Sequence, residues 1–189
     1  AKLRVFDFDD TLAKTDSKII LHKPDGSTLV LSPAEFAVYK PEPEDEFDFS
    51  QFEGPLINPR EVRAVAKVFR RVMDAGFEDR KVAILTARSV GSQDAIKGFV
   101  SDMGYNPEDI EVVTLGSSDP ADKASWIDQQ IQQGYNDVYF VDDVNKPARI
   151  GLKPNQSFPE IIDRLNAIYV EYVVGIAAGP DEVDEGIRQ

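Results

Sequence analysis

Short apolar runs alternate with longer amphipathic runs between residues 58 and 141, and this alternation sets the class of fold. Apolar runs of this length predict buried strands, and the amphipathic runs between them predict helices. Strands that alternate with helices form parallel sheets, because each helix carries the chain back across one face of the sheet. We therefore expect an α/β fold with a mainly parallel sheet covered by helices on both faces.

The expected elements follow from this pattern. Strands are predicted at residues 2–6, 81–86, 111–115 and 137–141, and helices at 58–75, 92–103 and 120–133. Gly76, Gly104 and Gly134 follow the three helices directly and are typical helix terminators. The apolar segment 158–178 is either one long helix or a helix followed by a strand at 169–176. The tail at 179–189 is rich in glycine, proline and acid, and we expect it to be frayed.

Residues 13–58 do not follow the alternation, and we expect them to form a small flap or cap inserted into one domain that spans residues 1–189. Two β-rich runs at 17–22 and 28–31 flank a Pro-Asp-Gly turn and predict a hairpin. Ser32-Pro33 starts a short helix. Residues 41–54 are acidic with interleaved phenylalanines, which predicts either an irregular segment held down by its aromatic side chains or a disordered loop.

Composition narrows the possible functions. The 34 acidic and 21 basic residues give a formal charge of −13, which opposes strong nonspecific binding to nucleic acid or to anionic membranes. The chain has no cysteine and a single histidine, so a metal site here needs oxygen ligands. The longest apolar stretch is too short to span a bilayer, and the start of the chain lacks a signal pattern. We expect a cytoplasmic protein.

The first predicted strand ends in Asp7, Asp9 and Asp10. Side chains two apart on a strand point the same way, so Asp7 and Asp9 are expected to project together while Phe8 returns to the core. Two neighbouring carboxylates repel each other unless a cation or a shared proton lies between them, which favours a divalent metal. The alternative is a solvated acidic turn after an edge strand.

Polar residues also follow the other predicted strands. Thr86 and Arg88 end the second strand, and the pair Asp142-Asp143 ends the last one. Lys123 lies near the start of the helix predicted at residues 120–133, which precedes the last strand. Because parallel strands end at one edge of a sheet, these groups are expected to converge, and together they can hold magnesium and a phosphoryl group.

This set of residues resembles the haloacid dehalogenase (HAD) superfamily of phosphohydrolases. The first motif of that superfamily matches residues 7–11, Asp-Phe-Asp-Asp-Thr, and the second matches Thr86. The third motif matches Lys123 and the fourth matches Asp142-Asp143. Thr86-Ala87-Arg88 and the paired acids are most similar to polynucleotide 3′-phosphatase domains. The resemblance covers residues 2–149 and implies a Rossmann-like three-layer α/β/α fold with a small hairpin flap.

The resemblance also implies roles for these residues. Asp7 would be the nucleophile that forms an aspartyl-phosphate, and Asp9 would act first as general acid and then as general base. Thr86 and Lys123 would hold the transferring phosphate oxygens, and Arg88 would contact the phosphate or the substrate beyond it. The implied Mg²⁺ ligands are Asp7, Asp9 through its backbone carbonyl, Asp142 and, through water, Asp143.

The implied function is magnesium-dependent hydrolysis of a phosphate monoester. A small flap leaves the cleft open, which suits a bulky substrate such as a nucleotide, a nucleic-acid end or a phosphoprotein, while the acidic flap disfavours a polynucleotide. A different class of function is a non-catalytic metal-binding scaffold whose partner docks on Phe36, Tyr39, Phe47, Phe49 and Phe52. A third possibility is a phosphorylated receiver that resembles response regulators. In that pattern the acidic pair comes earlier in the chain than the phosphoacceptor, and the order here is reversed. The sequence specifies neither which phosphate ester is cleaved nor the oligomeric state.

Overall fold

The computed structural model describes residues 1–117, 119–142 and 169–174. In this part of the chain, five strands form one parallel sheet in the order β10-β9-β1-β7-β8. The strands are β1 (Lys2–Phe6), β7 (Arg80–Thr86), β8 (Glu111–Thr114), β9 (Asp137–Asp142) and β10 (Tyr169–Val174). β1 lies at the centre of the sheet, between β9 and β7.

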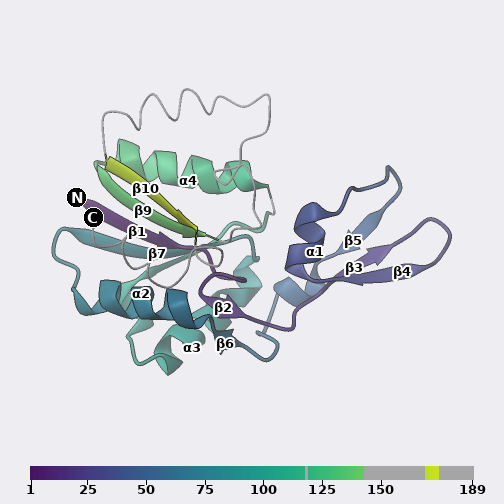
Figure 1. The fold of residues 1–189 in the computed structure, drawn as a ribbon, viewed down its shortest axis with the longest axis horizontal. Helices are drawn as coiled ribbons and strands as arrows, with labels where there is room; N and C mark the ends of the chain where they lie inside the picture. The colour runs from purple at the N-terminus through teal and green to yellow at the C-terminus, as the bar shows by residue number, and fades with distance from the viewer. Residues whose placement is uncertain (118, 143–168, 175–189) are drawn as a thin grey trace.

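Helices cover both faces of this sheet (Figure 1). On one face, α4 (Pro120–Gln132) packs Trp126 against Val5 and its neighbours. On the other face, α2 (Arg63–Asp74) and α3 (Gln93–Asp102) pack against Phe6 and Phe8. Val5 and Phe6 are adjacent in sequence yet lie in different clusters, because side chains alternate across a strand. The expected α/β architecture with a parallel sheet and helices is confirmed.

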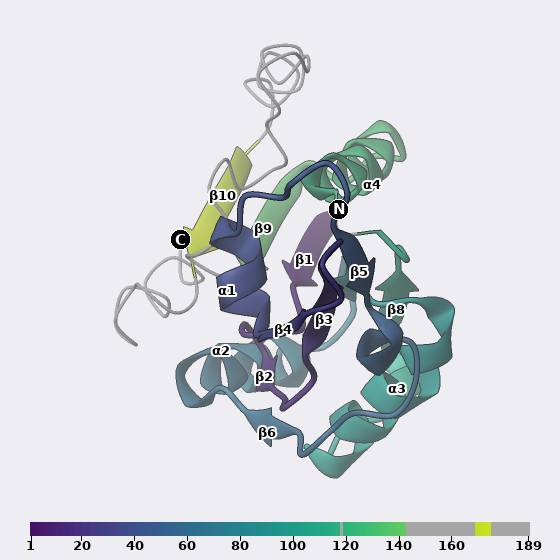
Figure 2. The ribbon, with the colours of Figure 1, turned by 90° about the vertical axis from the view of Figure 1, so that its right-hand side faces the viewer.

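A second, smaller sheet is built from residues that follow β1. It contains β3 (Ile19–His22), β4 (Thr28–Leu31) and β5 (Glu46–Asp48), all antiparallel, in the order β4-β3-β5. α1 (Pro33–Val38) and the 3₁₀ turn η1 (Ser50–Phe52) complete it. In Figures 1 and 2 this unit lies beyond the carboxyl ends of the parallel strands. The predicted hairpin and the predicted helix at Ser32-Pro33 are both confirmed.

The chain leaves and re-enters the core through a pair of two-residue strands. β2 (Ala13–Lys14) pairs antiparallel with β6 (Arg60–Glu61). The Val62 backbone N–H donates to the Leu12 carbonyl at 2.9 Å, which joins the start of α2 to the loop after β1. We call residues 15–58 the insertion.

The interior of the insertion is aromatic. Three buried aliphatic residues pack against half-buried rings, namely Phe36, Tyr39, Phe47, Phe49 and Phe52. These are the rings considered as a docking face from the sequence, and in the structure they pack mainly against one another and against the small sheet. Beside them, the Lys23 ammonium lies 2.6 Å from the Tyr39 hydroxyl and 2.9 Å from Asp45. These hydrogen bonds raise the pKa of Lys23.

The predicted start of the helix at residue 58 is wrong. α2 begins at Arg63, because Asn58 has a left-handed backbone (φ 47°) and residues 60–61 pair with β2 instead. The irregular segment at 41–54 also needs correction, since Glu46–Asp48 adds to the small sheet as β5. The predicted helix ends are confirmed, since Gly76 and Gly104 have φ of 83° and 100° just after α2 and α3.

The alternative of a strand near residue 169 is confirmed by β10, which pairs with β9. The segment 158–168, Asp143 and the predicted tail at 179–189 lie outside the described residues. Among the described residues, no helix combines the length and apolar character needed to cross a membrane.

The connections from β7 to β8 and from β8 to β9 are short. The 3₁₀ turn η2 (Val90–Ser92) precedes α3, and a second turn, η3 (Pro107–Asp109), precedes β8. The segment between Thr86 and Lys123 therefore contains α3 and β8 with their turns, and the insertion after β1 is the larger addition to the sheet.

Candidate active site

Asp7 follows the last residue of β1 and is buried, with 1% of its surface exposed. One carboxylate oxygen accepts a hydrogen bond from the Lys123 ammonium at 2.6 Å, and the other accepts from the Thr11 hydroxyl at 3.0 Å. Lys123 comes from the first turns of α4, 116 residues along the chain, and is itself 5% exposed. An ion pair this buried is screened very little by solvent.

Asp142 lies beside Asp7 at the carboxyl end of the sheet. Phe6 pairs with Val141, and the Asp7 backbone N–H donates to the Val141 carbonyl at 2.9 Å, so the parallel register places Asp7 next to Asp142. Neighbouring strands are about 4.8 Å apart. Val5 and Phe140, two residues before each aspartate, lie in the cluster under α4, so both carboxylates belong to that face of the sheet.

The loop after Asp7 turns sharply around one carbonyl group. The backbone N–H groups of Thr11, Leu12 and Ala13 all donate to the Phe8 carbonyl, at 3.0–3.2 Å. Asp10 adopts a left-handed backbone with φ of 59°, which aspartate tolerates better than most residues. Phe8 returns to the core as predicted and is fully buried. β1 itself ends at Phe6, so the strand alternation used to align Asp7 with Asp9 does not extend to Asp9.

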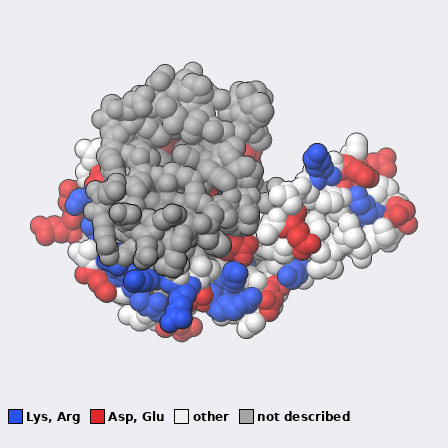
Figure 3. All heavy atoms as spheres, viewed as in Figure 1, with Lys and Arg blue, Asp and Glu red and all other residues white. Residues whose placement is uncertain are grey.

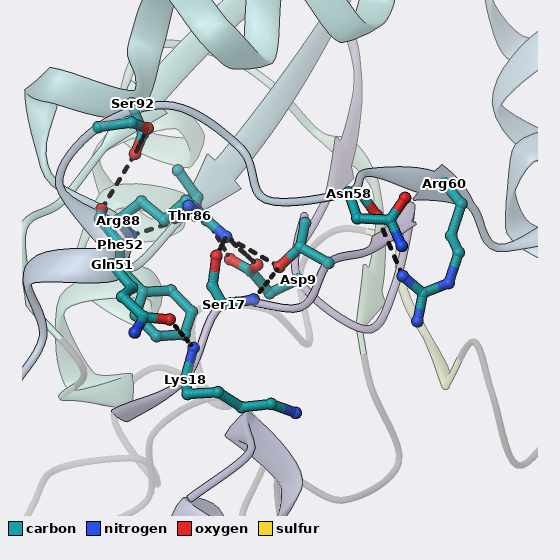
Figure 4. A network of polar contacts seen from close by, with 12 residues as sticks. Asp9, Ser17, Lys18, Gln51, Phe52, Asn58, Arg60, Thr86, Arg88 and Ser92 are labelled. Carbon is teal, nitrogen blue, oxygen red and sulfur yellow. Dashed lines mark hydrogen bonds and ion pairs between the residues drawn. The ribbon is translucent and has the colours of Figure 1, made fainter. Parts of the chain in front are cut away.

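Asp9 contacts a different cation. Arg88, from the loop after β7, donates Nε and Nη2 to the two carboxylate oxygens of Asp9 at 2.9 and 2.8 Å (Figure 4). The Arg88 side chain is 1% exposed and that of Asp9 is 15% exposed. Forked contacts of this kind are stronger and more directional than a single hydrogen bond. In this structure the Arg88 guanidinium is therefore engaged inside the protein.

The structure brings the sequence-predicted residues together in two groups. Asp7, Asp142 and Lys123 form one group, and Asp9 and Arg88 form the other. Thr86 ends β7, two positions beyond Ile84, which belongs to the α2 and α3 face. Its buried hydroxyl accepts a hydrogen bond from the Arg88 backbone N–H at 3.1 Å. Asp143 lies outside the described residues.

Four polar residues that sequence reasoning did not select also border these groups. Thr11 contacts Asp7, Thr15 and Ser17 contact Arg88, and Ser92 holds the insertion through its hydroxyl. Thr11 occupies the last position of the first motif, which is a signal the sequence carries. Isolated serine and threonine residues in a loop carry no comparable signal, because such hydroxyls are common on surfaces.

The donor set is compatible with a magnesium ion. Mg²⁺ in proteins takes oxygen ligands, often one or two carboxylates, and keeps several waters. Asp7 and Asp142 provide two buried carboxylates at adjacent positions, with Lys123 compensating one charge. Among the described residues no group of three or more carboxylate or histidine side chains is arranged to hold an ion. The residues present therefore suit an ion that shares its coordination with substrate and water.

Comparisons with known proteins give no relatives. No protein-family model matches the chain, and no curated protein or solved structure is significantly similar to it. The fold and the site must therefore be interpreted from their own geometry.

Proposed function

We propose that this protein is a magnesium-dependent phosphohydrolase that cleaves a phosphate monoester through an aspartyl-phosphate on Asp7. The observation that supports this most is the buried Asp7 carboxylate, held between Lys123 and Thr11 beside Asp142 at the carboxyl end of a parallel sheet. Ligands of open α/β sheets bind at this edge. The order of motifs that resembles the HAD superfamily supports the same assignment.

In the first half-reaction, an Asp7 oxygen attacks phosphorus and the bond to the leaving oxygen breaks, with a proton supplied by Asp9. In the second, water attacks phosphorus, Asp9 accepts its proton and the Asp7–phosphorus bond breaks. Lys123 reduces the electrostatic repulsion that an anionic phosphate meets near Asp7. Both oxygens of Asp9 accept from Arg88, which fixes the orientation of the carboxyl group, and the transferred proton is carried on a lone pair that the fork leaves free.

A magnesium ion would be held by Asp7, the backbone carbonyl of Asp9 and Asp142, with Asp143 acting through water. When bound, it supplies neutralisation of the charge on the phosphate and on the transition state. Thr86 is proposed to bind a phosphate oxygen, and Arg88 is proposed to contact the phosphate or the adjoining substrate group through Nη1, the nitrogen that its contacts with Asp9, Thr15 and Ser17 do not use. The insertion is proposed to act as a small flap over this edge of the sheet, and the protein is proposed to work in the cytoplasm.

The test is phosphate release from an aryl phosphate, with Asp7→Asn compared with the wild-type protein. We expect activity that needs Mg²⁺, disappears with a chelator and falls to background in Asp7→Asn. Asp9→Asn is expected to lose roughly 10²- to 10⁴-fold in kcat, the usual contribution of a proton relay. Asp10→Asn is the matched control, since it removes a carboxylate from the same loop and asparagine tolerates its left-handed backbone. Metal-dependent activity that survives in Asp7→Asn rules out Asp7 as the nucleophile.

A second candidate is a phosphatase for nucleotides or polynucleotide ends. The exposed side of α2 is basic, and Figure 3 shows Lys and Arg gathered along the edge of the molecule where Figure 1 places α2 and β6. The residues are Arg63, Lys67, Arg70 and Arg71, of which Lys67 lies four positions from both Arg63 and Arg71, and Arg70 also pairs with Glu61. Phosphate contacts make binding salt-dependent. If an oligonucleotide 3′-phosphate is the substrate, Arg63→Glu with Lys67→Glu lowers kcat/KM for it and leaves the aryl phosphate unaffected.

A further inference from the structure

Arg88 is the largest fully buried side chain in the described part of the protein, and its contacts reach beyond the core. Besides the fork on Asp9, its Nη2 atom lies 3.2 Å from the Thr15 hydroxyl and 3.2 Å from the Ser17 hydroxyl. Thr15 and Ser17 belong to the segment that leads from β2 into the small sheet. The guanidinium therefore contacts the candidate proton donor and the start of the insertion at once.

The same guanidinium also contacts the segment that returns from the small sheet. Its central carbon lies 4.7 Å from the centre of the Phe52 ring, in η1, which is within the range of a cation–π interaction. Figure 4 shows Arg88 between Asp9, Ser17 and Phe52. Arg88 thus lies between the outgoing and returning segments of the insertion.

Neighbouring contacts hold these segments to the same loop. The Ser92 hydroxyl lies 3.0 Å from the Phe52 carbonyl and 2.8 Å from the Gly54 carbonyl. The Lys18 backbone N–H donates to the Gln51 side chain at 2.7 Å, which ties the outgoing segment to the returning one. The loop after β7 and the two ends of the insertion are therefore connected by direct hydrogen bonds.

One nitrogen of the Arg88 guanidinium is not used in these contacts. Nη1 is buried and has no hydrogen-bond partner within the described residues. Buried guanidinium groups that serve the fold alone usually have their donors satisfied. The remaining donor favours a functional part for Arg88 in addition to its structural one.

We propose that Arg88 is a positioning residue that couples the seating of the insertion on the core to the orientation of Asp9. Displacement of Ser17 or Phe52 removes a contact that holds the guanidinium, and the Asp9 fork then loses its fixed geometry. Coupling of this kind is reciprocal, so a change at Asp9 also loosens the insertion. The consequence for proton transfer rests on the proposed function, because there Asp9 is the proton donor.

The first test is kinetic and uses the full chain with an aryl phosphate. Ser17→Ala and Phe52→Leu each remove one contact to Arg88 and leave Asp9 and Arg88 unchanged. The matched controls are Ser27→Ala, whose hydroxyl bonds Asp25 in the hairpin turn, and Phe36→Leu, which lies in the same aromatic cluster without a contact to Arg88. We expect a fall of about fivefold or more in kcat, with KM little changed, in the first pair only.

The second test does not depend on activity. In Asp9→Asn, hydrogen exchange measured by mass spectrometry is expected to accelerate by about fivefold or more at residues 15–18 and 51–54, while residues 20–31 keep their wild-type rates. Wild-type exchange at 15–18 and 51–54 in Asp9→Asn overturns the coupling, and so do equal kinetic effects in both variant pairs. A protein that releases no phosphate refutes the proposed function, and the exchange measurement still decides the coupling.

Discussion

The ion pair between Asp7 and Lys123 is the contact on which the candidate active site most directly depends. Both side chains are buried and their charged atoms lie 2.6 Å apart. In a low-dielectric interior each charge is tolerated because the other is present, so removal of one partner costs much more stability than the intact pair contributes. Asp9 and Arg88 repeat this arrangement nearer the surface.

Lys123→Met is expected to lower the free energy of unfolding by about 3 to 5 kcal/mol, because it leaves the Asp7 charge buried without its ammonium partner. Urea denaturation followed by circular dichroism measures this. The control is Lys97→Met, which removes a half-exposed lysine 3.8 Å from Glu108 and should cost less than about 1 kcal/mol. Equal stabilities of the two variants would contradict the importance of the buried pair.

Several carboxylates in and around the small sheet accept hydrogen bonds. Burial alone raises the pKa of Asp45, but hydrogen bonds from the Glu42 backbone N–H, Lys23 and Tyr39 outweigh it, and the pKa lies below its ordinary value of 3.8. Hydrogen bonds also lower the pKa values of three neighbouring carboxyls, Asp25, Glu35 and Asp48. A small sheet with this many stabilised carboxylates is sensitive to acid.

A carboxyl with a lowered pKa in the folded state stabilises that state above its unfolded pKa, and the contribution is lost as pH falls through the folded value. We therefore expect the small sheet to loosen below about pH 4. It should do so before the parallel sheet, because its buried apolar cluster is much smaller than the two clusters on the parallel sheet. Backbone amide signals of Ile19 and Leu21, compared with those of Val5 and Leu85 in an NMR titration, report the two sheets separately. Asp45→Asn should weaken the small sheet at pH 6 and reduce its acid response. Simultaneous loss of both sets of signals would refute this expectation.

The two sheets meet where the loop after β7 approaches the returning end of the insertion. Gly91 lies in this loop, and a Cβ atom at its position would overlap the Glu53 carbonyl oxygen. A side chain there requires the backbone of one segment to move. The insertion can therefore pack this closely against the loop only because residue 91 has no side chain.

Gly91→Ala is expected to destabilise the protein by about 1 to 3 kcal/mol, the usual cost of overpacking, and to expose residues 52–54 to protease. Gly98→Ala is the matched substitution, since Gly98 lies inside α3 with open space around it. It should instead stabilise the protein by about 0.5 to 1 kcal/mol, because alanine is the better helix former. Thermal unfolding compares the two. A Gly91→Ala protein as stable as wild type would show that this contact relaxes freely.

The sequence by itself predicted the elements whose signals are local. Strands β1, β7, β8 and β9, the hairpin of the small sheet and the glycines that end α2 and α3 follow from periodicity and turn chemistry within a few residues. The predicted start of α2 was wrong because Arg60–Glu61 pairs with Ala13–Lys14 as a short strand. The residues near position 60 contain no signal for pairing with a segment so distant in the sequence.

Tertiary structure decided which charges meet. The polar strand ends were visible in the sequence, but the contact of Asp7 with Lys123 joins residues 116 apart, and that of Asp9 with Arg88 joins residues 79 apart. Lysine and arginine side chains are long and carry no directional preference in the sequence, so their partners are set by how helices and loops pack on the sheet. Local periodicity specifies the elements, whereas the pairing of buried charges depends on distances that exist only in the folded protein.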